Sequence, residues 1–134
     1  MTVGRIVGSG LMLAAFQTCA VAAGAAQSVG STGAQTSLQA SAVALRGLDT
    51  LNGTSRDIAL EVGGTVRFGH LEITVDTCRV PEADPDGDAR AFLRIRDIRE
   101  SAPRFSGWMF ANSPALSALD HPRYDVWVVS CSMR

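Results

Sequence analysis

Leu71-Glu-Ile-Thr-Val-Asp-Thr-Cys78 is the stretch that decides the fold. Apolar side chains stand at every second position from Leu71 to Val75, and polar side chains stand between them. Because successive side chains of a strand point to opposite faces, this alternation predicts a strand with one face in the core and one in water. Such a strand is typical of an antiparallel sheet with one wet face.

The same signature extends to both sides of that stretch. Apolar residues alternate over 58–62, and Gly63-Gly64 then ends that predicted strand. Asn52-Gly53, before it, is a strong turn signal. Further strands are predicted over 92–98 and 105–110. About seven short strands in all predict a mainly β fold, a single small antiparallel sandwich or barrel.

The last predicted strand covers 124–131 and carries four apolar residues in a row at 126–129. A continuous apolar run favours a strand that is covered on both faces, so we expect this strand at the centre of a sheet. One short helix is expected before it. Ser113 would cap that helix, Pro114 would take its first position, and 115–119 would continue it.

Residues 1–26 have the layout of a secretory signal peptide. Arg5 supplies the positive charge, an uncharged stretch covers 6–26, and Ala23-Gly24-Ala25 offers a small-residue cleavage site. An uncleaved anchor is the alternative, because the uncharged stretch is just long enough to span a bilayer. We expect a periplasmic or secreted protein that has no stable membrane span after cleavage.

Composition divides the rest of the chain into two parts. Residues 27–42 consist almost wholly of Ser, Gly, Thr, Gln and Ala, so they cannot bury enough apolar surface to offset their ordering entropy. We interpret them as a flexible low-complexity linker. Residues 43–134 are then the β domain, which is large enough for a modest core.

The cysteines follow from the predicted leader. Cys19 lies within it and would leave with it, so Cys78 and Cys131 are the two that stay. An exported chain with two cysteines usually bridges them, which predicts a disulfide between Cys78 and Cys131. A nucleophilic Cys78 would need a free thiol with a lowered pKa, and neither cysteine sits in a C-x-x-C arrangement.

Charge argues against one class of partner. The chain carries 12 basic and 13 acidic residues, a formal net charge of −1. No basic face dominates, so we expect no nucleic-acid partner.

An acidic run, Glu82-Ala-Asp-Pro-Asp-Gly-Asp88, invites a calcium interpretation. On the EF-hand template the closing bidentate position falls on Leu93, which cannot bind a cation. We therefore interpret the run as a solvated hairpin loop, and we expect neither a metal nor a cofactor.

His70 and His121 are the two histidines of the chain. A small envelope hydrolase that uses His121 with Asp120 or a serine such as Ser117 is the alternative function. No G-x-S-x-G motif supports it, and His121 could instead cap carbonyls at the end of the predicted helix. We therefore predict no catalytic residues and no enzyme.

The densest aromatic segment is Phe105-Ser-Gly-Trp-Met-Phe110. On the strand alternation, Trp108 and Phe110 share one face, opposite Met109. Exposed aromatic side chains can stack on sugar rings or on a partner protein. Together with Tyr124, these two residues are the predicted binding surface. The expected function is non-catalytic binding of an unknown envelope component, a protein or a glycan.

Several motifs carry a resemblance to a known family. They are Phe105-Ser-Gly-Trp-Met-Phe-Ala111, Ser113-Pro-Ala-Leu116, His121-Pro122 and Tyr124-Asp-Val-Trp-Val128 before Cys131, with Val62-Gly63, Phe68-Gly-His-Leu-Glu-Ile73 and Cys78 upstream. In these motifs, which extend over about 45–131, the chain resembles the domain of unknown function 2155 family. Members of that family are small exported proteins, mainly of alphaproteobacteria. The resemblance implies export and a Cys78–Cys131 pair. It offers no known catalytic residues.

Overall fold

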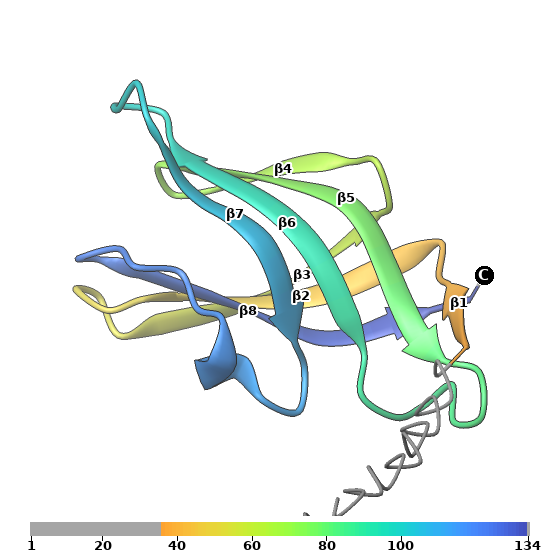
Figure 1. Ribbon diagram of the computed structural model, residues 1–134. Helices are drawn as coiled ribbons and strands as arrows, with labels where there is room; N and C mark the ends of the chain where they lie inside the picture. Colours follow the sequence, from red (N-terminus) through yellow and green to blue (C-terminus); the bar gives the residue numbers. More distant parts are fainter. Residues whose placement is uncertain (1–35, 134) are drawn as a thin grey trace, which may run out of the picture. The chain divides into compact units, whose positions relative to one another are not determined.

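A computed structural model describes residues 36–133. The predicted leader and residues 27–35 of the predicted linker lie outside the described residues. Figure 1 shows two sheets, both antiparallel, and buried side chains of both sheets form one core, which confirms the mainly β fold. Within residues 36–133 the sheets stay separate and do not close into a barrel. The strands are β1 (Ser37–Gln39), β2 (Ala42–Asp49), β3 (Thr54–Glu61), β4 (Thr65–Phe68), β5 (Leu71–Pro81), β6 (Arg90–Asp97), β7 (Pro103–Phe110) and β8 (Tyr124–Ser132).

The large sheet has five strands in the order β1-β5-β6-β7, with β4 also paired to β5. Its organising strand is β5, which contains the stretch quoted at the start. Leu71, Ile73 and Val75 are fully buried, as their alternation predicts. On one edge of β5, β4 pairs with its first residues and β1 pairs with its last, so β5 has neighbours on both sides.

The small sheet has the order β3-β2-β8. β2 and β3 form a hairpin around the predicted Asn52-Gly53 turn. Gly53 has a φ of 64°, in the left-handed region that favours glycine. The Asp49 carboxylate accepts hydrogen bonds from the backbone N–H groups of Leu51 and Asn52. Turn chemistry and alternation therefore specify this hairpin together.

The prediction of a central last strand is wrong. β8 pairs only with β2 and forms an edge of the small sheet, and β2 is the central strand. Trp127 is partly exposed, and Val129 is 45% exposed where the pairing register shifts opposite Ala44 and Leu45. Residues 126–129 are consecutive apolar residues, but no second layer covers the outer face of β8 within the described part of the chain.

The linker boundary also needs correction, because the ordered fold begins before residue 43. β1 pairs with residues 79–81 at the end of β5, and the Ala40 N–H donates to the Cys78 carbonyl at 2.8 Å. Ala40 itself is buried. These contacts are mainly backbone hydrogen bonds along a strand edge. They do not require large apolar side chains, so composition could not reveal them.

The expected short helix is reduced to η1, a 3-10 turn over Pro114–Leu116. Pro114 does open it, but the Ser113 side chain makes no capping hydrogen bond. Leu116 is 77% exposed, so the turn has no apolar face to bury against the sheets and does not lengthen into the predicted helix. Within residues 36–133, no helix has the length and apolarity needed to cross a membrane.

A disulfide joins Cys78 on β5 to Cys131 on β8, with 5.9 Å between their Cα atoms. The predicted pairing is therefore present in the structure, and it links the large sheet to the small one. Cys78 is fully buried in the core between the sheets. The core members with no more than 1% exposure are Leu45, Leu71, Ile73, Val75, Cys78, Ala91, Leu93, Ile95, Met109, Val126 and Val128.

Gly69, in the turn between β4 and β5, supplies a first testable prediction. Its φ is 57°, and a Cβ added there would lie 2.5 Å from the Tyr124 hydroxyl oxygen. We expect Gly69→Ala to lower the free energy of unfolding by about 2 kcal/mol, measured by urea denaturation. Gly53→Ala is the matched control. Gly53 also has a positive φ, but an added Cβ would meet nothing within 4 Å. Gly53→Ala should therefore lower the free energy of unfolding by only about 1 kcal/mol. Equal losses would show that the contact with Tyr124 contributes nothing.

Candidate functional site

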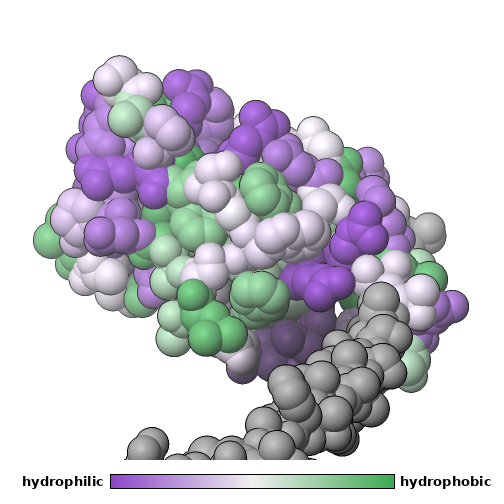
Figure 2. All heavy atoms as spheres, in the orientation of Figure 1, coloured by the Kyte–Doolittle hydropathy of each residue, from purple (hydrophilic) through white to green (hydrophobic). Residues whose placement is uncertain are grey.

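The outer face of the large sheet gathers aromatic side chains and arginines. Its members are Arg79 on β5, Arg90 and Phe92 on β6, and Trp108 and Phe110 on β7, which we call the aromatic–arginine face. All five are partly exposed. Their strand neighbours Cys78, Ala91 and Met109 point into the core, so alternation turns these five outward. Figure 2 shows apolar and weakly polar residues in the middle of this view, with strongly polar residues toward the rim.

Trp108 is held in a defined orientation. It lies directly opposite Phe92 across the β6–β7 pair, and the two rings meet edge to face with centroids 5.6 Å apart. The guanidinium carbon of Arg90 lies 5.9 Å from the centroid of the Trp108 ring. Both arrangements are favourable for an aromatic ring, because its face is electron-rich and its edge is electron-poor. Trp108 is therefore positioned before any partner arrives.

The arginines on this side of the sheet fall into two kinds. Arg94 forms a two-pronged ion pair with Asp76 at 2.8 and 2.7 Å, and Arg96 pairs with Glu72 at 2.8 Å. The hydrogen bond from Arg96 lowers the pKa of Glu72 below its usual value.

Arg79 and Arg90 are of the second kind. They lie directly opposite each other on β5 and β6, and within residues 36–133 neither has an ion-pair partner. Arg79 donates to the Ser37 hydroxyl oxygen at 3.3 Å. The two positive charges of this pair are therefore not neutralised by the fold.

An open groove of about 410 Å³ lies over this second pair of arginines. It is lined by Ser37, Arg79, Arg90, Trp108 and Phe110. A smaller hollow of about 100 Å³ shares three of these residues, and Asp88 also borders it. Ring faces and unneutralised guanidinium groups together can hold a flat ligand that carries a negative charge.

Tyr124 does not belong to the predicted binding surface. It is 3% exposed, and its ring packs against those of Phe68 and His121 with centroids 5.6 and 5.2 Å apart. Tyr124 shares the inward face of β8 with Val126 and Val128, which are also buried. The alternation of side chains along β8 could have predicted that Tyr124 points inward, whereas its aromatic character alone could not.

His121 is placed differently from either expectation. Its side chain is 1% exposed, and Nε2 lies 3.1 Å from a carboxylate oxygen of Asp97. Nδ1 accepts the backbone N–H groups of Arg123 and Tyr124, both at 3.1 Å. Since Nδ1 is an acceptor, Nε2 carries the proton, and this N–H donates a hydrogen bond to Asp97. The ring thus holds the chain entering β8, and it neither caps η1 nor bonds to Asp120 or Ser117.

Asp97 is the buried charge that the sequence analysis missed. It ends β6 with no exposed surface, and it accepts hydrogen bonds from His121 and from both the backbone and the guanidinium of Arg99. The Arg99 guanidinium holds the pKa of the Asp97 carboxyl far below its usual range. A signal existed, because Leu93, Ile95 and Asp97 alternate onto the core face of β6.

The acidic run lies in an exposed loop between β5 and β6. Asp88 accepts the backbone N–H of Asn112, which ties this loop to the segment after β7. In the part of the chain that the structure describes, no three His, Cys, Asp or Glu side chains gather in a way that could hold a metal ion.

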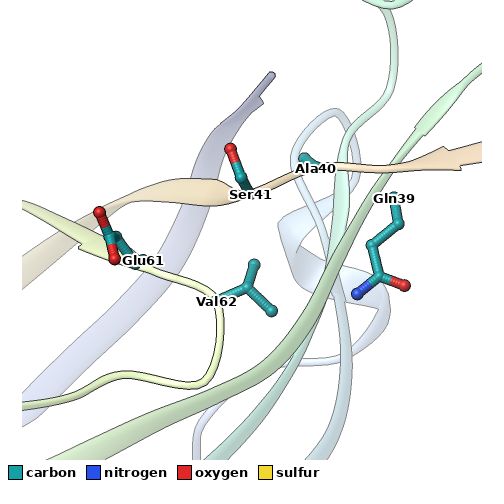
Figure 3. Close-up of a pocket in the computed structure, with 5 residues that line it drawn as sticks. All are labelled: Gln39, Ala40, Ser41, Glu61 and Val62. Carbon is teal, nitrogen blue, oxygen red and sulfur yellow. The ribbon is translucent and has the colours of Figure 1, made fainter. Parts of the chain in front are cut away.

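Another open hollow, of about 550 Å³, lies where the chain passes from the large sheet to the small one (Figure 3). Gln39, Ala40, Ser41, Glu61 and Val62 line it. Figure 3 shows the Gln39 side chain extending to the opposite side from the side chains of Ser41 and Glu61. Because they do not converge on one point, this hollow is a weaker candidate than the aromatic–arginine face.

Comparison with known proteins gives a family but no activity. A family model described as "Uncharacterized protein conserved in bacteria (DUF2155)" matches residues 43–131. The chain is similar to "Uncharacterized protein RP359" of Rickettsia prowazekii (strain Madrid E), with 28% identity over 88 residues, or 63% of this chain. It spans 56% of the length of that relative. No solved structure matches. All members of the aromatic–arginine face lie within the matched residues.

Proposed function

Because the chain belongs to the DUF2155 family of uncharacterised bacterial proteins, we propose its function from its own surface. It is an exported, non-catalytic binding domain, and its aromatic–arginine face contacts a component of the cell envelope. The single observation that carries this proposal is the partly exposed Trp108, which Phe92 holds in place and which is bordered by two arginines without carboxylate partners within residues 36–133.

Preorganisation is the physical reason that this face suits binding. Immobilising a flexible side chain at an interface costs about 0.5–1.5 kcal/mol, so a face whose large side chains are already fixed loses less on association. Phe92 holds Trp108 edge to face, and Arg90 lies over the same ring. Tryptophan and arginine are also the residue types that most often dominate binding energy.

A sequence pattern and a structural feature support the placement in the envelope. Residues 1–26 have the layout of a signal peptide, which would direct the chain out of the cytoplasm. The bond between Cys78 and Cys131 is of a kind that persists in oxidising compartments such as the periplasm. Neither depends on the identity of the partner.

The environment of His121 favours binding over hydrolysis. A general base needs a free lone pair within reach of a substrate. The Nδ1 lone pair of His121 already accepts two backbone N–H groups, and the side chain is 1% exposed. Asp97, which accepts the Nε2 proton, is fully buried as well.

Site-specific photocrosslinking in intact cells tests the proposal. We expect Phe110 replaced by p-benzoyl-phenylalanine to form an adduct with an envelope component, because this position borders the groove. The same replacement at Asp57 on β3 is the matched control, since Asp57 is well exposed on the small sheet and distant in the fold. Adducts are read by gel shift after separation of the periplasmic and membrane fractions.

A second variant shows whether the face itself is responsible. Trp108→Ala, combined with the crosslinker at 110, should reduce the adduct at least about fivefold, as expected for a residue that dominates binding. Circular dichroism checks that the variant is folded. Adducts of equal yield from positions 57 and 110, or none from either, would refute the proposed function.

A further inference from the structure

We infer that the groove over Arg79 and Arg90 binds the carboxylate of an acidic sugar, whose ring packs against Trp108 and Phe110. The inference rests on the proposed function and names the class of ligand for the same face. It is carried by the charge pattern of the large sheet, by the hydrogen-bond donors of the groove and by its size.

The charge pattern of the sheet is uneven. Arg79 and Arg90 occupy directly opposite positions on adjacent strands, where like charges destabilise a sheet. On the same face, Arg94 and Arg96 each have a carboxylate of their own. The fold therefore neutralises one pair of arginines and leaves the other pair repelling each other. An anion bound between Arg79 and Arg90 would remove that repulsion.

The groove offers donors that suit a carboxylate. A guanidinium presents planar N–H groups that match the two oxygens of a carboxylate, and charge-assisted bonds of this kind are stronger than neutral ones. The Ser37 hydroxyl oxygen accepts a hydrogen bond from Arg79, which leaves its own O–H to donate to a ligand.

The walls of the groove favour a sugar over a simple inorganic anion. Trp108 and Phe110 line it beside the arginines, and aromatic faces pack against the C–H surface of a sugar ring. Asp88 borders the adjoining hollow, where its carboxylate can accept hydroxyl hydrogen bonds and would repel a second negative charge. A ligand with one carboxylate and several hydroxyl groups therefore suits both the arginine side of the groove and the Asp88 side.

The size of the groove argues against a folded protein segment as its ligand. A volume of about 410 Å³ lies within the usual range of small-molecule pockets, about 300–1,000 Å³. A helix, with a diameter of about 10–12 Å, needs a long groove, and this one is bounded by five residues. A short saccharide therefore fits better than an amphipathic helix.

Titration of the mature protein with a disaccharide of glucuronic acid and a neutral hexose, which carries a single carboxylate, tests the inference, with the methyl ester of the same disaccharide as the uncharged control. We expect the acid to bind at least about tenfold more tightly than the ester, since charge-assisted hydrogen bonds are lost in the ester. Calorimetry gives the affinities, and tryptophan fluorescence in a Trp127→Phe background reports contact of the sugar ring with Trp108.

Matched variants locate the site. Arg79→Gln and Arg90→Gln should each weaken binding of the acid by about tenfold, whereas Arg94→Gln, on the same face but paired with Asp76, should leave it within about twofold. Trp108→Ala should weaken it as well. Equal loss in all three arginine variants would indicate general attraction by charge and would overturn the inference.

Other ligands give outcomes of their own. Inorganic phosphate that binds as tightly as the acid would indicate an anion site without sugar recognition, and an acidic peptide that binds more tightly would indicate a protein partner. Either result, or the absence of binding by the acid, overturns the inference. If the crosslink from position 110 forms in cells all the same, only the class of ligand is wrong and the proposed function stands.

Discussion

Removal of the disulfide, by replacing both Cys78 and Cys131 with alanine, should lower the free energy of unfolding by about 4 kcal/mol. The bond joins residues 53 positions apart, so it restricts a large part of the unfolded chain. It also fastens β5 of the large sheet to β8 of the small one. A loss of this size is comparable to the whole stability of a marginal domain.

Urea denaturation followed by circular dichroism measures this effect. The reduced wild-type protein is the control, because it lacks the bond but keeps both side chains. We expect its midpoint to lie close to that of the double variant and well below that of the oxidised protein. Three coinciding midpoints would show that the bond contributes no stability.

The second large effect is expected at Asp97. Asp97→Ala should lower the melting temperature by at least about 10 °C, because it leaves the buried Nε2–H of His121 without an acceptor. Asp76→Ala is the matched control. Asp76 also pairs with an arginine, but on the surface, where such pairs contribute little, so its loss should cost about 2 °C. Equal shifts in the two variants would show that burial of Asp97 adds nothing.

The same carboxylate makes stability depend on pH. Arg99 holds the pKa of Asp97 below its ordinary value of 3.8, so the ionised form is favoured in the folded state. The stabilisation is then fully present above that ordinary value and is lost as the pH falls below it. Melting curves from pH 6 to pH 2 should therefore fall less steeply for Asp97→Asn than for the wild type. Parallel curves would contradict this.

Sequence pattern predicted which face of a strand is buried, but not which strand lies beside it. Leu71, Ile73 and Val75 are inside because alternation depends on the strand alone. The position of β8 depends on its neighbours, so the apolar run at 126–129 predicted a centre and the structure shows an edge. β1 escaped prediction for a related reason, since its main contacts are backbone hydrogen bonds to β5.

The candidate site could be predicted only in part. Trp108 and Phe110 share the outer face of β7 as their spacing predicts, and Tyr124 was wrongly added to them on residue type alone. Arg79 and Arg90 were missed because they belong to different strands. Only the register between β5 and β6 places them opposite each other, and no local pattern specifies that register.

The pairing of β2 with β8 has a consequence for the order in which the domain is built. β2 begins at Ala42, whereas β8 begins only at Tyr124, after all the other strands that the structure describes. The small sheet therefore lacks its third strand, and Cys78 lacks its partner, until the ribosome has added residues 124–132. Until then the nascent domain stays incompletely folded, so its small sheet and its disulfide are both completed late.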